Sequence, residues 1–405
     1  MNDLTILVAA RDEEERIGET VRALRRDFPG AEIFVVDGRS EDATAECAEE
    51  AGAAVLRLER RGKGEALSAG ERAAPAGPLL LCDADLRGSL RPLTERRADL
   101  VVAAFRQKVG GGFGLAKRVG QGLVRLRTGT APGEPLSGQR YLSERARAAC
   151  FPLAPGFGCE VRMTIDALRA GLSFEEVELD LGHRATGRDA AGFAHRARQL
   201  LDAVLAAGPL ALNYRGLRLP LVGWSVGLVA LARRQPAVAL VAALGLLDDL
   251  YSGRERGFGA HLRAGRTTGV LKLVGIPLAG LLATRSVSGA LAVGLGANAL
   301  NQLDTKPGRA LKAFLLVPPP SAYSPAAVLL LPYDLRERAM LGDAGSNALG
   351  AVLGLNSVVR LHGRARWTAL GALAGLNLLG ERVSLGSLIE RTPVLRELDA
   401  LGRLP

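Results

Sequence analysis

The sequence predicts two domains of different class: a doubly wound α/β domain over residues 1–204 and an all-α, multi-span membrane bundle over residues 205–405. Before residue 204, short β-branched runs alternate with charged amphipathic stretches, as in a parallel sheet covered by helices. After it, charged residues gather into islands between apolar runs rich in Leu, Ala, Val and Gly. The 405 residues are enough for each domain to bury its own core.

In the first domain, short apolar runs rich in β-branched residues mark the strands. Strands are expected at Leu4–Ala10, Glu32–Asp37, Ala53–Leu58, Leu79–Cys82 and Leu100–Ala104. Amphipathic stretches between them predict helices at Glu13–Arg26 and Ala43–Ala51, the second with Asp42 as its N-cap.

Seven apolar runs define the predicted bundle. They are Leu217–Ala232, Pro236–Leu247, Thr268–Ala283, Val287–Leu300, Ser324–Leu331, Asn347–Val359 and Trp367–Leu379. Several are shorter than the roughly 17–25 residues of a lone membrane span, and the shortest would also suit buried core helices of a soluble helical domain. The Gly- and Ala-rich series as a whole favours a bilayer. Basic islands between the runs then predict a multi-pass protein of the inner membrane with cytoplasmic loops.

Composition restricts the partners and the compartment. The net charge of +10 suits nucleic acid, an anionic lipid surface or a phosphorylated substrate. An aromatic content of 4% and the lack of zinc-finger or helix-turn-helix spacing argue against nucleic acid. The four cysteines form no CxxC pair, which indicates a reducing compartment. The short apolar run Ile6–Ala10 is followed at once by charged residues, so no signal peptide is expected and the first domain should remain cytoplasmic.

Acidic residues follow two of the predicted strands. One strand ends at Asp37, and another runs into Asp83-Ala84-Asp85. Ligands of doubly wound sheets bind at the carboxyl ends of the strands. Two carboxylates spaced by one residue can hold a divalent cation, Mg²⁺ or Mn²⁺, against a diphosphate and so stabilise a nucleoside diphosphate as leaving group.

Several ordered motifs of residues 4–190 resemble the GT-A (Rossmann-like) glycosyltransferases of family 2, in particular glucosyl-3-phosphoglycerate synthases and dolichyl-phosphate sugar synthases. The motifs are Ala9–Glu14, Val35–Thr44, Arg61–Ala66, Asp83–Asp85, Pro135–Gly138 and Gly156–Glu160. The resemblance implies nucleotide-sugar contacts from Ala10, Arg11, Glu13, Asp37, Gly62, Lys63 and Asp83. It places the metal ion on Asp83, Asp85 and His183.

The same resemblance implies an acceptor beside Ser137 and Gly138, with Asp85 and Glu160 as catalytic residues. Two alternatives stay open, because Glu160 would also suit the first turn of a helix and a single histidine is often structural. The nearest competing class is nucleotidyltransferase, which opens with a Gly-rich loop after the first strand. Here that loop, Arg11–Glu15, is acidic and contains no glycine before Gly18.

Three acidic clusters border the apolar runs of the second domain. Asp248-Asp249 ends one run, Asn298-x-x-Asn301-x-x-Asp304 ends another, and Gly342-Asp343-Ala344-Gly345-Ser346 precedes a third. Ionisable groups at the ends of membrane helices are functional candidates, although each could also be an interfacial cap. Gathered on one face, the clusters would hold Mg²⁺ and a phosphate.

These segments resemble the polyprenyl-phosphate N-acetylhexosamine-1-phosphate transferases over residues 217–390. The resemblance implies catalytic Asp248, Asp249, Asp304 and Asp343, a metal ion on Asp248, Asp249 and Asp343, and lipid-phosphate contacts from Asn298 and Asn301. The chain departs from the family in two respects. Thr305–Arg309 replaces the usual second acidic step, and there is no late histidine cluster. Lipid-phosphate binding is therefore expected more firmly than phosphosugar transfer.

Together these features predict a membrane-bound glycosyltransferase, a hexosyltransferase, that moves a sugar from a nucleotide-diphosphate sugar to an acceptor at the inner membrane face. A polyprenyl phosphate or other lipid acceptor would place it in cell-envelope glycan synthesis. The alternative is a transferase with a soluble acceptor such as 3-phosphoglycerate and the bundle as a non-catalytic anchor. A transporter is disfavoured because the sequence shows no inverted repeat.

Overall fold

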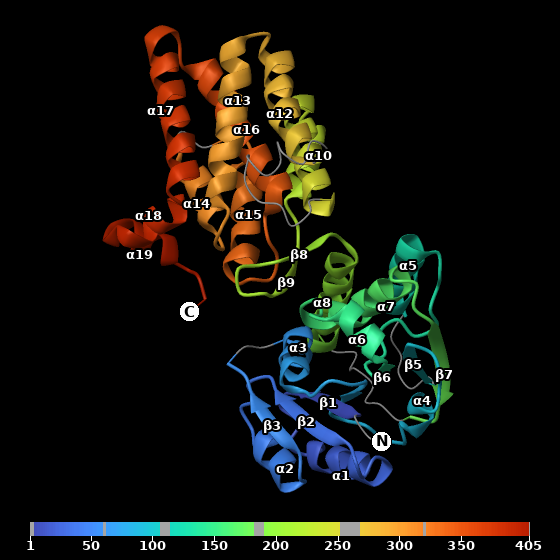
Figure 1. Cartoon of the computed structure of the whole chain (residues 1–405). Coiled ribbons are helices and arrows are strands. Elements are labelled where there is room, and N and C mark those ends of the chain that lie inside the picture. The colour runs from blue at the N-terminus through green and yellow to red at the C-terminus, as the bar shows by residue number, and fades with distance from the viewer. Residues whose placement is uncertain are drawn as a thin grey trace. The chain divides into compact units, whose positions relative to one another are not determined.

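The computed structural model describes residues 4–59, 62–105, 114–181, 190–251, 268–318 and 321–404 (Figure 1). The chain forms two compact units, Met1–Leu210 and Ala211–Pro405. The boundary thus falls at residue 210, where the sequence predicted 204.

A seven-stranded sheet organises the first unit, in the order β3-β2-β1-β4-β6-β5-β7. Only β6 is antiparallel to its neighbours, β4 and β5, and the other pairings are parallel. This confirms the predicted α/β domain with a mostly parallel sheet. The strands are β1 (Thr5–Ala10), β2 (Glu32–Asp37), β3 (Ala54–Arg57), β4 (Leu79–Asp83), β5 (Leu100–Phe105), β6 (Arg140–Leu142) and β7 (Phe174–Leu179).

Helices cover both faces of this sheet (Figure 1). They are α1 (Ile17–Asp27), α2 (Thr44–Glu50), α3 (Lys63–Ala73), α4 (Arg91–Thr94), α5 (Leu115–Thr128), α6 (Glu144–Cys150), the 3₁₀ turn η1 (Gly156–Gly158), α7 (Cys159–Arg169) and α8 (Ala190–Ala207). Alternation along β1 separates two cores: Ile6 and Val8 pack with α1, whereas Leu7 packs with α3 and α7.

Two predicted helix starts are wrong. The first helix begins at Ile17 because residues 13–16 form a turn, in which the Glu13 carbonyl accepts from the Arg16 and Ile17 amides at 3.0 Å. The second helix begins at Thr44, one residue later than predicted, and its cap position is Ala43. Asp42 is therefore not the N-cap residue of α2, although its Oδ1 accepts from the Thr44 amide at 3.1 Å.

The second unit consists mainly of helices, with one short hairpin at its start. The hairpin is β8 (Leu210–Leu212) and β9 (Arg218–Pro220), and the helices are α9 (Trp224–Ala232), α10 (Pro236–Tyr251), α12 (Thr268–Thr284), α13 (Val287–Leu303), α14 (Arg309–Leu316), α15 (Ser324–Leu335), α16 (Gly342–Arg360), α17 (Gly363–Arg382), α18 (Leu385–Arg391) and α19 (Pro393–Ala400). The predicted run Leu217–Ala232 is not one helix, because Pro220 and Gly223 separate β9 from α9. The sequence did not predict α14, α18 or α19.

Close glycine contacts hold the centre of this unit together. A Cβ on Gly350 of α16 would lie 2.3 Å from the Gly296 carbonyl oxygen of α13, and one on Gly354 would lie 2.3 Å from the Ala292 carbonyl oxygen. Such distances admit no side chain, so the two helices pack backbone to backbone. Across the described residues, the structure contains no helix both long and apolar enough to cross a membrane. The membrane bundle therefore stays a prediction.

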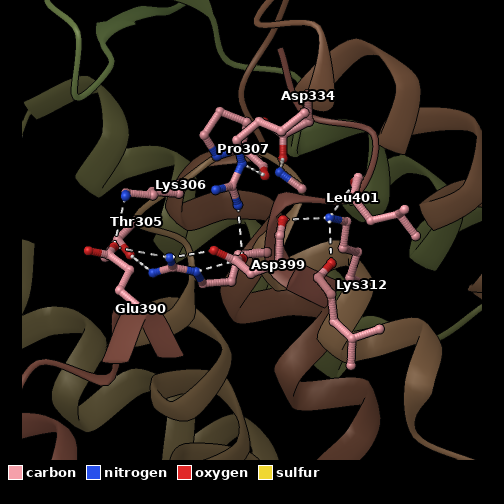
Figure 2. A network of polar contacts seen from close by, with 12 residues as sticks. Thr305, Lys306, Pro307, Lys312, Asp334, Glu390, Asp399 and Leu401 are labelled. Atoms are coloured by element: carbon pink, nitrogen blue, oxygen red, sulfur yellow. Dashed lines mark hydrogen bonds and ion pairs between the residues drawn. The ribbon is translucent and has the colours of Figure 1, made fainter. Parts of the chain in front are cut away.

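A polar network fixes the C-terminal helices to α14 (Figure 2). The buried Arg309 guanidinium donates to both carboxylate oxygens of Asp399, at 3.0 and 2.8 Å, and to Thr305 Oγ1 at 2.8 Å. Arg403 donates to Asp399 as well, at 2.9 Å. Burial by itself raises the pKa of Asp399, but the hydrogen bonds from Arg309 and Arg403 outweigh it and lower that pKa to about 2.

We predict that Asp399→Asn destabilises the second unit at pH 7 by roughly 2–3 kcal/mol, because it leaves the Arg309 charge buried beside a neutral amide. A carboxyl group whose pKa is lower in the folded protein than in the unfolded chain stabilises the fold fully at pH values above the unfolded pKa of ~3.9. This stabilisation is lost as the pH falls towards the folded pKa of about 2. The difference between wild type and variant should therefore shrink between pH 5 and pH 2.5. Unfolding followed by tryptophan fluorescence reports this unit, because the chain's 2 tryptophans, Trp224 and Trp367, both belong to it.

The matched control is Glu397→Gln, which removes an exposed carboxylate from the same helix. It should leave the unfolding midpoint nearly unchanged at each pH. An Asp399→Asn protein with wild-type stability at pH 7 would contradict the role given to this ion pair.

Candidate active site

The carboxyl ends of β1, β2 and β4 meet at one edge of the sheet. In the strand register, Ala10 lies opposite Asp37 of β2, and Ala9 lies opposite Asp83 of β4. Asp37 is buried and accepts from the Ser40 amide at 3.1 Å. Both acidic clusters thus lie where doubly wound sheets bind ligands.

Lys63 links three elements at this edge. It is the first residue of α3, and its ammonium lies 2.6 Å from Asp83 Oδ1 and 2.7 Å from Glu160 Oε1 in the first turn of α7. Burial by itself lowers the pKa of Lys63, but the Asp83 and Glu160 carboxylates outweigh it and hold that pKa well above its usual value. The lysine therefore provides a permanent positive charge between two carboxylates.

The predicted acceptor segment, Pro135–Gly138, reaches the same edge of the sheet. A Cβ on Gly138 would lie 2.4 Å from both Asp83 carboxylate oxygens and 2.6 Å from the Lys63 ammonium, so a side chain there would displace these charged groups. The neighbouring Ser137 is buried, and its hydroxyl has no hydrogen-bond partner among the described residues. A buried unpaired hydroxyl is costly in a folded protein, which makes Ser137 a candidate for a ligand contact.

Arg140 is a site residue that sequence reasoning missed. Its side chain is fully buried and donates to the Pro135 and Ser137 carbonyls, at 3.0 and 2.7 Å, and to Thr164 Oγ1 at 2.9 Å. These bonds fix the segment that carries Ser137 and Gly138. No local sequence signal separates this arginine from the exposed ones, because its strand, β6, has only three residues.

Other predicted residues lie around this centre. Arg11 is exposed and pairs with Asp12 at 3.2 Å, while the Glu13 amide donates to Thr44 Oγ1 at 2.8 Å. Gly62 directly precedes α3, and Asp85 is half-buried two residues beyond the end of β4. The predicted metal ligand His183 lies outside the described residues.

The residues at this edge fit a divalent cation that is completed by a substrate. Among the described residues, no group of three or more His, Cys, Asp or Glu side chains is arranged to hold a metal ion by itself. Mg²⁺, however, is usually bound through one or two carboxylates together with substrate phosphates. Asp83 and Asp85 provide such hard oxygen donors at a strand end. The nearby thiols of Cys82 and Cys159 are buried, which raises the pKa of both well above the usual value and leaves them neutral.

In the second unit, a lysine again joins the predicted aspartates. Lys272 of α12 lies 2.6 Å from Asp248 Oδ2 of α10 and also pairs with Asp343 in the first turn of α16. Asp249 accepts from the backbone amides of Asp343 and Ala344, both at 2.9 Å, and so binds the N-terminus of α16. Lys272 was missed, although a single charge inside an apolar run is a usable signal.

The two asparagines of the motif Asn298-x-x-Asn301 contact different helices. Asn301 Oδ1 accepts from Ser346 Oγ at 2.8 Å, which joins it to the glycine-rich aspartate motif. Asn298 instead donates to Asn377 of α17 at 2.5 Å. Asp304, which follows α13, lines a pocket of about 30 Å³ with Lys306 and other residues of this unit.

The mostly parallel sheet, with helices on both faces and a lysine–carboxylate centre at its carboxyl edge, gives the first unit the doubly wound α/β architecture. Residues 5–111 match the family described as Glycosyl transferase family 2. This range contains Asp37, Lys63 and Asp83.

Curated relatives resemble the same half of the chain. Glycosyltransferase AglJ of Haloferax volcanii is 29% identical over 196 residues, which cover 45% of this chain and 64% of AglJ. Glucosyl-3-phosphoglycerate synthase of Mycolicibacterium paratuberculosis is 28% identical over 240 residues, 50% of this chain and 71% of the relative. The chain therefore spans just under two thirds of AglJ.

Among solved structures, glucosyl-3-phosphoglycerate synthase from Mycobacterium tuberculosis in complex with Mn²⁺, uridine diphosphate and phosphoglyceric acid is 25% identical, with a TM-score of 0.44. The match covers 50% of this chain and 78% of that structure.

We predict that Gly138→Ala weakens nucleoside-diphosphate binding at least about tenfold, or ~1.4 kcal/mol, because the methyl group collides with Asp83 and Lys63. Isothermal titration of the full chain measures the affinity. Gly122→Ala is the matched control, since a Cβ on that exposed glycine meets nothing within 4 Å. Equal affinities in the two variants would show that the contact between Asp83 and Lys63 takes no part in nucleotide binding.

Proposed function

We propose that this chain is a glycosyltransferase that moves a sugar from a nucleoside-diphosphate sugar to a lipid-linked acceptor at the inner membrane face. The main support is that Lys63, Asp83, Gly138 and Glu160 come together at one edge of the sheet. Two of them, Lys63 and Asp83, lie within residues 5–111, which match the glycosyltransferase family. A polyprenyl-linked acceptor would place the reaction in cell-envelope glycan synthesis.

The chemistry needs a neutralised diphosphate. A divalent cation held by Asp83 and Asp85 would supply that charge to the leaving nucleoside diphosphate. Lys63 provides a second positive charge close to it, on a flexible stem that can turn from Asp83 to a phosphate oxygen. Glu160, which lies 2.7 Å from Lys63, and the hydroxyl of Ser137, which directly precedes Gly138, would orient the acceptor.

The outer surface of the second unit supports a lipid environment. Large apolar side chains are exposed on several of its helices, among them Leu282 of α12 at 67%, Leu329 of α15 at 72% and Leu378 of α17 at 65%. Such surface is unfavourable in water and favourable against acyl chains. This exposure supports the proposal that the second unit contacts the membrane, with the first unit on its cytoplasmic side.

The lysine–aspartate centre of the second unit would bind the phosphate of that lipid. Lys272 can pair with a phosphate, while Asp248, Asp249 and Asp343 offer oxygen donors to Mg²⁺. Phosphosugar transfer is a weaker candidate for this centre, because Thr305–Arg309 stands in place of the family's acidic step.

A soluble acceptor is the second candidate. The relative named glucosyl-3-phosphoglycerate synthase points to 3-phosphoglycerate, and the match to it covers 71% of that protein. In this case the second unit would only anchor the enzyme. Mass spectrometry of the products formed from UDP-glucose with either 3-phosphoglycerate or a polyprenyl phosphate distinguishes the two.

We predict that Asp85→Asn lowers the rate of sugar transfer at least about 100-fold, and Asp83→Asn by a similar factor, because each removes charge from the proposed cation site. Product formation in the presence of Mn²⁺ or Mg²⁺ is the measurement, with unfolding midpoints as the control for folding. Asp99→Asn, which changes a carboxylate bonded to Ser143 and Ser173 in the same unit, should keep the wild-type rate. An Asp85→Asn protein with normal metal-dependent turnover would remove the Asp-x-Asp assignment.

We also predict Mg²⁺-dependent binding of a short-chain polyprenyl phosphate to the full chain. Asp249→Asn and Asp343→Asn should each weaken it about tenfold or more, because one carboxylate charge near the cation is lost. Glu381→Gln on α17 is the control. Binding that is equal in all four proteins, with or without Mg²⁺, would leave these aspartates as helix caps.

A further inference from the structure

The outer face of α5 in the first unit combines apolar and cationic side chains. Its exposed positions follow a helical stripe that comprises Leu115, Arg118, Gly122, Arg125 and Leu126. Leu115 is 59% exposed and Leu126 is 81% exposed, values far above those of a helix that covers a core. The helix carries four basic residues and no acidic one.

Among the residues that the structure describes, ion pairs within the unit do not account for these arginines. Lys117, on a different face, pairs with Glu134 at 2.5 Å, but within the described residues no ion pair engages Arg118 or Arg125. An ordinary solvated helix face carries charges of both signs and few large apolar residues. Leucines placed beside unpaired arginines are instead typical of helices that lie in the interface of an anionic bilayer.

The inner side of the same helix contacts the acceptor segment. Besides the pair between Lys117 and Glu134, Gln121 Nε2 donates to the Gly133 carbonyl at 3.1 Å. A Cβ on Gly120 would lie 3.1 Å from Pro135. The segment that these contacts hold continues directly to Ser137 and Gly138.

We propose that the outer face of α5 is a docking surface for an anionic lipid bilayer, by which the first unit presents its acceptor segment to the membrane. Docking itself is inferred from charge and exposure. The part that concerns the acceptor rests on the proposed function. A helix in the headgroup region would hold the segment that its inner side contacts, from Gly133 to Pro135, close to the lipid phosphates, and this segment continues to Ser137 and Gly138. The acceptor class is then a lipid whose phosphate lies at that surface.

The test places an environment-sensitive NBD label on α5 of the full chain. Leu126→Cys is labelled in a Cys47→Ser background, because the other three cysteines are buried. Vesicles of phosphatidylcholine alone are compared with vesicles that also contain phosphatidylglycerol. We expect a blue shift and protection from iodide only with phosphatidylglycerol. A label at Thr130, beyond the end of the helix, is the positional control.

Removing the two arginine charges measures how much they contribute to docking. Each basic residue near an anionic surface contributes about 1 kcal/mol, so Arg118→Gln with Arg125→Gln should lower the docked-to-undocked ratio of the label about 30-fold. Arg26→Gln with Arg97→Gln removes the same charge from exposed sites elsewhere in the unit and should leave the ratio unchanged.

Three results would overturn the proposal. They are a label that stays in water with both vesicles, a label already shielded from iodide without vesicles, and a label that responds to an oligonucleotide but not to lipid. Sugar transfer measured on the same samples separates the two hypotheses. Docking without transfer refutes the proposed function alone, whereas transfer with an undocked label refutes this surface alone.

Discussion

Asp83 and Glu160 belong to different elements, the end of β4 and the start of α7, and the Lys63 ammonium holds them at one point. Two carboxylates brought to one point in a partly buried edge repel each other, and the lysine charge between them offsets that repulsion. Gly138 packs against the same pair, since a Cβ there would lie 2.4 Å from the Asp83 carboxylate oxygens and 2.6 Å from the Lys63 ammonium. The strand ends, the helix N-terminus and the acceptor segment thus depend on one ion-pair centre.

The second unit also uses one lysine to hold acidic side chains from different helices together. Lys272 brings α10 and α16 together through Asp248 and Asp343, and Asp249 binds the amides that open α16. A lysine suits both places because its charge is compact and its stem is flexible. It can stabilise acidic clusters before a substrate arrives and can then turn to a phosphate, whereas a fixed guanidinium fork would be harder to displace.

Features that depend on periodicity could be predicted from the sequence, whereas most features that depend on long-range contacts could not. The parallel strands, Asp37 and Asp83 could be located because buried strands end abruptly in acidic residues. Arg140 could not, since the buried bonds that define it come from residues up to 24 positions away. The predicted start of α1 at Glu13 failed for a similar reason. Charge and helix propensity extend the helix backwards, but tertiary bonds such as that from the Glu13 amide to Thr44 hold this stretch in a turn.

The loop after Asp304 has a structural role in the second unit. Thr305 and Arg309 both take part in the network that holds α18 and α19. Lys312 extends it by donating to three carbonyls at the end of α19, at 2.7 to 3.1 Å (Figure 2). Basic residues that bind a helix C-terminus and a buried carboxylate are already neutralised. This loop therefore fixes the C-terminal helices, and the phosphate binding that we propose for this unit would depend on Lys272 and the aspartates around it.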